Sequence, residues 1–501
     1  MNGDGITRRQ FLKIGGGLLA AGALHLHGSL LRRVTATSTG GVLDVTSLDK
    51  TLIENLLKTA MQRGGTFSEL FAQQRVGIDW RLDNGQLTAA ETSRADGVGI
   101  RVADSGSFGY AFCEELSEEN LVRAAKKASA QMASGERGGL HPLERRSHSE
   151  HCPVSQPVLT AGSAELLDRI RTADTAARGV AANVRRVVVS LSEHSDYRMV
   201  ANSQGSWIED IAPRLFLEVQ VEAGTDERAE IGRACAGTRM GYEFFDTFPP
   251  AALGERAARQ ALAFLAAEPM ESGPLPVVTG NRCGYLFHVL IGRHREAEGG
   301  LHDEPATGGR ILSPLITYLD DATTANGFGS YNMDDEGVPA QRTILVRLGH
   351  PDKLLLDQLG AKRRHTLSSG SGRRADYRHP PIPCLSNAVL AAGVSRHDTI
   401  MEEIERGLYI VEVAHTHVEE PGGTLLFPIR EAYSIRQGKP GDAVKNVMLV
   451  TTRDSLLQSI ERVGDDPAFV PGFTHKNGQT LPVSFGAPSV RFKQLSIAAL
   501  R

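Results

Sequence analysis

Apolar residues recur at three- and four-residue spacing in four segments of the first half of the chain. Residues 51–63 carry such a stripe, which a pair of glycines ends, and Ser117 stands where it would cap a second helix. Runs that are rich in β-branched and aromatic residues lie between the helical segments. The other two segments with helical spacing cover residues 164–178 and 251–267. We therefore expect the first half to combine helices with a sheet.

The second half of the chain has a different pattern. Short runs of β-type composition, for example at residues 409–413 and 424–428, alternate with Gly-rich turns. One helix is expected at residues 398–406, and residues 269–276 are expected to form a linker. The pattern predicts an α+β fold, in which a mixed N-terminal domain and a β-rich C-terminal domain meet near residue 272.

The N-terminus has the layout of a twin-arginine export signal. Arg8 and Arg9 precede a short, weakly apolar stretch at residues 14–24, with small residues that suit cleavage. The alternative is a buried first helix, but three consecutive glycines make a poor helix interior. We expect residues 1–45 to be signal and linker, and the protein to be periplasmic or otherwise extracytoplasmic. The signal is either cleaved or retained as a membrane anchor.

The composition and the absence of common motifs argue against several classes of function. The 501 residues include 55 Lys and Arg against 59 Asp and Glu, a net charge of -4, so nucleic acid is not expected as a partner. The five cysteines are widely spaced and form no C-x-x-C pair, which argues against a disulfide framework or a zinc ribbon. The G-x-S-x-G, P-loop and H-E-x-x-H motifs are all absent.

Two histidine-containing segments are the candidate metal sites, and the first contains His288 and His294. These residues are six positions apart, which places them about 120° apart around a regular helix. They would converge on one ion only if the helix breaks, and Gly292 is the candidate position for the break. The alternative is one packed and one surface histidine.

The second segment follows a predicted strand and reads His415-Thr416-His417-Val418-Glu419. If the strand continues, both histidines and Glu419 share one face, and two histidines with one carboxylate suit a metal ion. The alternative is a solvated polar face. His475, in a turn-like loop, is a further candidate ligand.

A basic stretch at residues 362–374 is the candidate binding segment for substrate. It ends in Arg373 and Arg374, and guanidinium groups could bind a carboxylate or another anion. The alternative is a solvated charged loop.

Motifs along almost all of the mature chain resemble the TldD/PmbA family, peptidases that were once called modulators of DNA gyrase. The most specific matches are GVGIRV at residues 97–102, DDEGVP at 334–339 and GSGRR at 370–374. Further matches lie at residues 109–111, 202–205, 341–343, 377–380, 407–409 and 478–483. Together these motifs predict the fold, although each alone is short.

The resemblance implies an α/β N-terminal domain at residues 46–270 and a β-rich, barrel-like C-terminal domain at residues 271–501. It also implies a dimer that encloses a narrow chamber. Family members are zinc peptidases that cut unfolded peptides. Their metal site uses an H-E-x-x-x-H motif, whose Glu is the general base, and a cysteine near the C-terminus.

This sequence departs from the family pattern at the metal site. His288 matches the first histidine, but Val289 replaces the catalytic Glu and Arg293 replaces the second histidine. The cysteine position falls on Thr474 or, with a one-residue slip, on His475. Valine has no proton-accepting group, and a guanidinium that stays protonated is not a zinc ligand. We therefore expect zinc to be absent or altered.

Two hypotheses follow from this departure. The first is a non-catalytic member that binds unfolded peptides, as a homodimer or as the partner of an intact paralogue. The second is a rewired metal-dependent peptidase with substitute ligands and a substitute base. Its candidate ligands beside His288 are His294, His415, His417 and His475, and its candidate bases are Glu296 and Glu419. The first is favoured because losing a base is easier than rebuilding one.

Overall fold

The structure is a computed structural model that describes residues 44–104, 106–297 and 312–499. Nearly all of the expected export signal lies outside these residues. The described chain mixes helices and strands, as the α+β pattern predicted, and a β-barrel forms in its C-terminal region. Within the described ranges, no helix is both long enough and apolar enough to cross a membrane.

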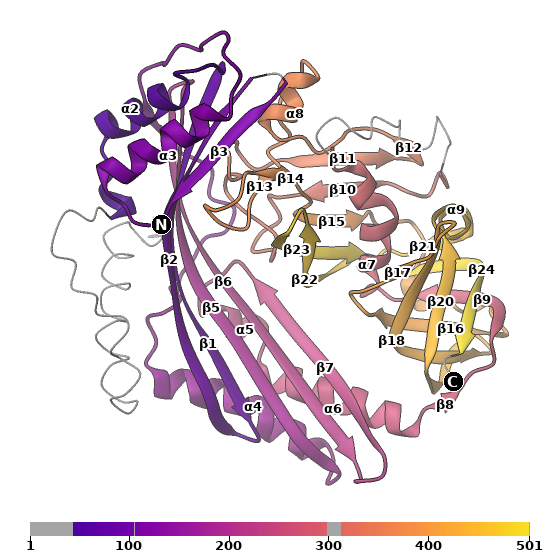
Figure 1. Ribbon diagram of the computed structural model, residues 1–501. Helices are drawn as coiled ribbons and strands as arrows, with labels where there is room; N and C mark the ends of the chain where they lie inside the picture. The colour runs from indigo at the N-terminus through magenta and orange to yellow at the C-terminus, as the bar shows by residue number, and fades with distance from the viewer. Residues whose placement is uncertain (1–43, 105, 298–311, 500–501) are drawn as a thin grey trace.

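A long, curved, seven-stranded sheet organises the first half of the chain (Figure 1). Its central strands pair antiparallel in the order β3-β2-β1-β5-β6, and both β4 and β7 pair with β6. The strands are β1 (Phe67–Asp83), β2 (Gln86–Ala103), β3 (Phe108–Cys113), β4 (Glu144–Arg146), β5 (Val184–Asn202), β6 (Ser206–Gly224) and β7 (Ala229–Thr238).

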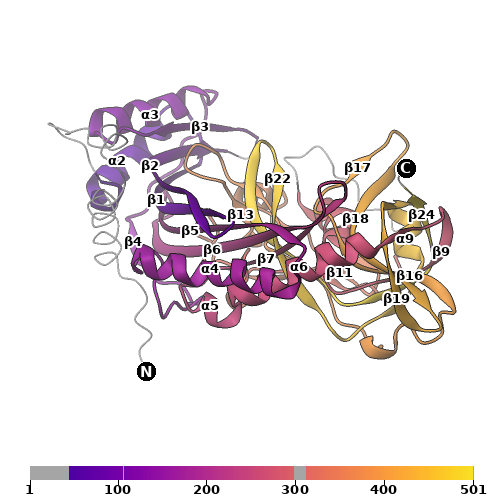
Figure 2. The ribbon, with the colours of Figure 1, turned by 90° about the horizontal axis from the view of Figure 1, so that it is seen from below.

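Helices cover one face of this sheet because alternate strand residues are apolar. In β1, the even-numbered residues Leu70, Ile78 and Leu82 are buried against helices. α2 and α3 pack at one end, and α4 and α6 lie side by side at the other (Figure 2). The helical segments are η3 (Val45–Ser47), α2 (Lys50–Ala60), α3 (Glu118–Ala130), α4 (Ser163–Val180), α5 (Phe244–Thr247) and α6 (Pro250–Ala266).

Five strands of the second half close into a barrel. They pair in the order β16-β9-β24-β20-β18, and β18 pairs back with β16 to complete the ring. The ring strands are β9 (Gly273–Thr279), β16 (Arg406–Val413), β18 (Thr424–Arg436), β20 (Val447–Thr452) and β24 (Val490–Ala499). The attached elements are β8 (Glu268–Pro269), β17 (Val418–Glu419), β19 (Lys439–Lys445), β21 (Ile460–Val463) and α9 (Arg453–Gln458).

A six-stranded sheet lies between the barrel and the first half, in the order β12-β11-β10-β15-β23-β22 (Figure 1). The helix α7 (Gly284–Phe287) packs on its strands β15 and β23. The strands are β10 (Tyr318–Asp321), β11 (Arg342–Arg347), β12 (His350–Pro351), β15 (Asn387–Leu390), β22 (Ala468–Lys476) and β23 (Gln479–Ala487). The short elements nearby are α8 (Gln358–Arg363), β13 (Gly372–Arg373), β14 (Ile382–Pro383) and η6 (His397–Thr399).

The motifs that carry the family resemblance meet where the two halves of the chain touch. Arg101, from the first half, forms ion pairs with Glu69 and with Glu336 of the second half. Arg374, from the GSGRR motif, pairs with the same Glu69. All four side chains are buried, so these motifs hold the halves together.

Two expected elements of the second half are wrong. The helix expected at residues 398–406 is a single 3-10 turn, and Arg406 already begins β16. The linker expected at residues 269–276 contains the start of β9, which pairs with β16 inside the barrel. In both cases pairing with a distant strand overrides the local pattern.

Candidate functional site

The segment around His288 changes helical pitch. It begins as α7, widens to a π-type turn over His288–Gly292 and tightens to a 3-10 turn over Arg293–Arg295. The pitch therefore changes at Gly292, where the sequence analysis placed a break. The change leaves His294 exposed, whereas His288 is buried.

His288 lies among aromatic rings. Its ring centroid is 4.8 Å from that of Phe485 and 6.2 Å from that of Tyr285. Its Nε2 atom lies 3.4 Å from Oγ1 of Thr474, and its Nδ1 atom is buried with no hydrogen-bond partner among the described residues. Of the two candidate matches for the family's cysteine, Thr474 is the one that contacts His288.

His415 and His417 approach the same rings, although β16 ends at Val413 and does not continue through them. Their ring centroids lie 5.5 Å and 6.0 Å from that of Tyr285, and the Tyr285 hydroxyl is 3.1 Å from Nδ1 of His417. His415 also packs 4.9 Å from Phe485, and its buried Nε2 atom has no hydrogen-bond partner in the ranges that the structure describes. Three of the five candidate histidines thus gather around one tyrosine.

Glu296, a candidate base, is buried in an ion pair. One of its oxygens accepts a hydrogen bond from Nζ of Lys476 at 3.0 Å, and the other accepts from the backbone amide of Leu385 at 2.8 Å. Lys476 is buried as well and also donates to the carbonyl of Pro383. Both carboxylate oxygens are therefore engaged, which suits a structural role better than proton transfer.

The remaining candidates do not join the His288 group. His475 is exposed on β22, and its Nδ1 atom lies 2.9 Å from Oγ1 of Thr480 on the neighbouring strand. Its neighbour Thr474 points inward, because successive side chains of a strand face opposite sides. Glu419 is exposed on the two-residue strand β17.

The donors around His288 do not fit a zinc centre. In the described part of the chain, no three of the candidate nitrogen and carboxylate atoms near His288 lie within 4.8 Å of one another. Burial, followed by the charge of Arg293, lowers the pKa of His288 to about 3, and Lys476 acts in the same direction. A neutral imidazole is therefore the form that its surroundings favour.

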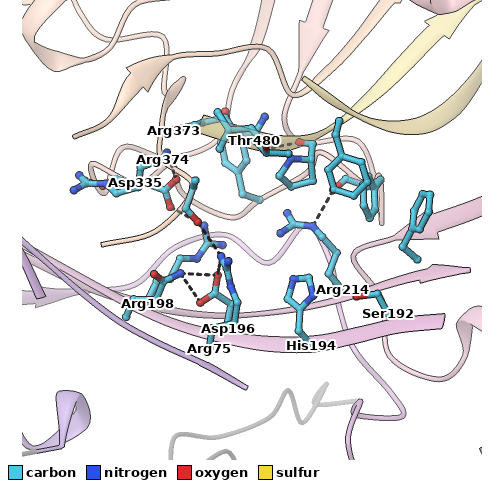
Figure 3. Close-up of a pocket in the computed structure, with 18 of the residues that line it drawn as sticks. Arg75, Ser192, His194, Asp196, Arg198, Arg214, Asp335, Arg373, Arg374 and Thr480 are labelled. Carbon is cyan, nitrogen blue, oxygen red and sulfur yellow. Dashed lines mark hydrogen bonds and ion pairs between the residues drawn. The ribbon is translucent and has the colours of Figure 1, made fainter. Parts of the chain in front are cut away.

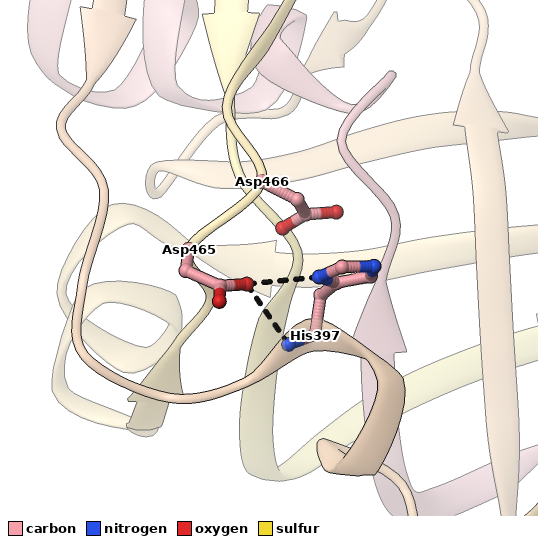
Figure 4. Close-up of side chains that lie close together, drawn as sticks. All are labelled: His397, Asp465 and Asp466. Atoms are coloured by element: carbon pink, nitrogen blue, oxygen red, sulfur yellow. Dashed lines mark hydrogen bonds and ion pairs between the residues drawn. The ribbon is translucent and has the colours of Figure 1, made fainter.

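One group of three metal-type side chains does occur among the described residues, at His397, Asp465 and Asp466 (Figure 4). Oδ1 of Asp465 lies 2.8 Å from Nδ1 of His397, and both residues are exposed. Asp466 accepts hydrogen bonds from the amide and hydroxyl of Ser489. These carboxylates already fix a loop, and the group shares no residue with the His288 region.

Arg373 and Arg374 line a cavity of about 200 Å³ between the first sheet and the β22–β23 hairpin (Figure 3). Neither is a solvated loop residue, because both side chains are buried. Arg374 pairs with Glu69 across the contact between the halves. Arg373 donates to two backbone carbonyls, those of Leu385 and Pro482.

The sequence analysis missed three charged or titratable residues that the structure places at these sites: Lys476, His194 and Arg214. Lys476 is two positions beyond Thr474 on one strand, so alternation alone places it on the buried side. His194 and Arg214 lie on the long strands β5 and β6. The sequence signal that could have found His194 and Arg214 is a polar residue at every second position of a long strand.

Comparison with known families accounts for most of the chain. Models of the PmbA/TldA metallopeptidase match as domain 1 over residues 68–131, central domain over 157–265 and C-terminal domain over 279–499. A metalloprotease TldD homologue of Buchnera aphidicola from Acyrthosiphon pisum is 30% identical over 445 residues, covering 86% of this chain and 92% of the relative. A metalloprotease of Methanothermobacter thermautotrophicus is 30% identical over 423 residues, covering 83% and 92%.

Solved structures share the fold at lower sequence identity. A candidate modulator of a DNA gyrase from Thermotoga maritima superposes with a TM-score of 0.70 at 19% identity, covering 89% of this chain and 99% of that one. TldE from Thermococcus kodakarensis superposes with a TM-score of 0.67 at 17% identity, covering 89% and 100%.

Proposed function

The chain belongs to the PmbA/TldD metallopeptidase family, and from that premise we propose that it is a non-hydrolytic member that binds unfolded peptides. It acts either as a homodimer or as the partner subunit of an intact family paralogue. Its place of action is the periplasm or another extracytoplasmic site, reached by the twin-arginine pathway.

One observation carries this proposal: the position of the expected base holds no proton-accepting group, and the charged groups around it are a cation and a paired carboxylate. Val289 is a buried hydrocarbon, and Arg293 is a cation where the family has a ligand. The nearby buried carboxylate, Glu296, is held by Lys476. A hydrolytic zinc site needs ligands that leave an open position and a free base, and this set supplies neither.

The test is metal content and peptide turnover of the same preparation. Plasma mass spectrometry on the native protein, beside a His288→Ala variant, is expected to find no metal that depends on His288. A fluorescent unfolded peptide is expected to bind and to be recovered intact by mass spectrometry. About one metal per chain that disappears in the variant, together with cleaved peptide, would overturn the proposal.

A restoration variant sharpens this test. Val289→Glu, Arg293→His and Thr474→Cys together return the family's base, second histidine and cysteine. If the substitutions alone explain the loss of hydrolysis, the triple variant gains metal binding and cleaves the bound peptide. The matched control replaces Val289 by Gln instead, which leaves a similar shape without a base.

A second candidate function, the rewired metal peptidase, is favoured by one observation. Nδ1 of His288 and Nε2 of His415 are buried and have no hydrogen-bond partner within residues 44–104, 106–297 and 312–499, and both rings pack against Phe485. Unpaired buried nitrogens of this kind can hold a ligand or a metal. Metal that is lost in both His288→Ala and His415→Ala variants would support this candidate over the first.

A further inference from the structure

The cavity between the two halves has a polar floor that strand pairing builds. His194 on β5 lies directly opposite Arg214 on β6 and beside Gly77 on β1. Gly77 has no side chain, and a Cβ atom at this position would lie only 2.9 Å from Cβ of His194. The imidazole of His194 makes no hydrogen bond within the described part of the chain, and it faces the cavity (Figure 3).

The cavity carries an excess of positive charge. Five arginines and three aspartates line it. Three of the arginines have carboxylate partners: Arg75 pairs with Asp196, Arg198 with Asp335 and Arg374 with Glu69. Arg214 and Arg373 have no carboxylate within 4.0 Å among the described residues, where their guanidinium groups donate only to backbone carbonyls.

Arg214 has unused donors. Its Nε atom donates to the carbonyl of Phe328 at 3.0 Å, and its Nη2 atom donates to that of Ser330 at 3.5 Å. A guanidinium has five N–H groups, so these two bonds leave three, including both on Nη1. The side chain is only 6% exposed, and an unpaired buried cation is costly until an anion joins it.

An aromatic wall stands next to this cation. The rings of Phe216, Phe328 and Phe473 pack on one another with centroids 5.4 to 5.6 Å apart. All three line the cavity, and Phe473 remains 42% exposed. The cavity therefore offers an unpaired guanidinium and an apolar surface side by side.

We propose that this cavity binds an α-carboxylate that carries an apolar side chain. Arg214 accepts the carboxylate in a two-bond fork, and the three phenylalanines receive the side chain. A volume of about 200 Å³ is below that of pockets for drug-sized ligands and suits one terminal residue. The carboxylate belongs either to the last residue of a peptide or to a free apolar amino acid.

The site is distinct from the His288 region. Phe473 and Thr474 are consecutive on β22, so they face opposite sides of the hairpin. One side contacts His288, and the other forms the cavity wall. Only the peptide source of the carboxylate rests on the proposed function, and the carboxylate site itself does not.

Calorimetric titration of the full chain with N-acetyl-L-phenylalanine tests the site. The acid is expected to bind, and N-acetyl-L-phenylalaninamide is expected to bind at least about tenfold more weakly because its uncharged end forms weaker bonds to Arg214. Equal binding of acid and amide would overturn the proposal. So would binding of inorganic phosphate as tight as that of the acid.

A third probe, free L-phenylalanine, shows whether the carboxylate comes from a free amino acid or from the end of a peptide. Free L-phenylalanine that binds more tightly than the acetylated acid assigns the site to free amino acids, and weaker binding assigns it to peptide ends. Acid binding without binding of a longer unfolded peptide would reject the proposed peptide function alone. Peptide binding without acid binding would reject the carboxylate site alone.

Two arginine variants separate recognition from stability. Arg214→Met removes an unpaired buried charge, so it is expected to abolish acid binding without lowering the Tm. Arg239→Met is the matched control, because Arg239 is equally buried but pairs with Asp210 at 2.7 Å and does not line the cavity. The control is expected to lower the Tm and keep acid binding. An Arg214→Met protein that binds the acid as tightly as the wild type would overturn the proposal.

Discussion

His288 is a buried histidine whose surroundings favour one protonation state. One ring nitrogen faces a threonine hydroxyl, the other has no hydrogen-bond partner in the described part of the chain, and the charges of Arg293 and Lys476 act on the ring. A neutral imidazole is the form that this environment favours. The residue therefore contributes to stability in a way that depends on pH.

The pKa of His288 is about 3 in the folded chain, mainly because of burial, against 6.5 for the unperturbed group. Above pH 6.5 both states hold the ring neutral. Below it the unfolded chain takes up a proton that the folded chain does not, so falling pH destabilises the fold through this residue. Relative to a His288→Gln variant, the wild type is expected to lose about 2 kcal/mol of unfolding free energy between pH 7.5 and pH 5.

Denaturant titrations of both proteins at the two pH values measure this difference. The comparison must be with the variant, because burial raises the pKa of Asp320 and of Glu336 to about 7, and these groups act with the opposite sign. A difference between the proteins that does not change with pH would show that His288 titrates normally.

Sequence reasoning singled out the departures from the family pattern at residues 289 and 293 but not the side-chain pairs that form in the folded chain. Val289 and Arg293 were evident from the motif alone, since register depends only on local order. The Glu296–Lys476 pair was not evident from the sequence, because its members are 180 positions apart and no local pattern specifies their contact. The unpaired Arg214 was missed for the same reason, since its lack of a carboxylate is a property of the folded cavity.

Among the elements, β2 shows why the family motif contains glycines. Gly97 packs against the ring of Tyr377, and Gly99 packs against Tyr110, whose hydroxyl donates to the Tyr377 carbonyl at 2.7 Å. A Cβ atom at either glycine would overlap a tyrosine side chain. The missing side chains let a strand of the first half contact a loop of the second.

Gly97→Ala is expected to lower the free energy of unfolding by about 1 to 3 kcal/mol, because the added methyl group overpacks the contact with Tyr377. The same substitution in a Tyr377→Ala background is expected to cost much less, since the ring is gone. A double-mutant cycle by denaturant unfolding measures this coupling. Equal costs in both backgrounds would place the effect in the strand itself.

The helices of the first half were largely predictable, since each has an apolar stripe and a local end signal. The helix that Ser117 caps begins at Glu118, and the Ser117 side chain accepts a hydrogen bond from the amide of Asn120. The strands were harder to predict. β6 and β7 form a long hairpin in which buried apolar residues alternate with polar ones, but the partner strand and the register of each are set by residues far apart in the chain.

For the whole molecule, Glu69 is a buried side chain that joins charges from the two halves. It is fully buried on β1 and pairs with both Arg101 and Arg374, which reach it from two different motifs. Each half therefore contributes buried charges to one shared network of ion pairs.

Glu69→Gln is expected to lower the free energy of unfolding by about 3 to 5 kcal/mol, because the buried Arg374 loses its carboxylate partner and Arg101 keeps only Glu336. Glu119→Gln is the control, since its ion pair with Arg123 is exposed and is expected to leave stability unchanged. Calorimetry of both variants checks the prediction. Similar unfolding of the two would contradict the central place of Glu69.

The alternation along β22 also restricts how this chain can change in length. Phe473 lines the cavity, and Thr474 contacts His288. Inserting or deleting one residue before them would turn each side chain to the opposite face of the strand and so exchange the two environments. Insertions and deletions in this hairpin should therefore be tolerated in pairs and rejected singly. Homologues that preserve both environments are expected to differ in hairpin length by even numbers of residues.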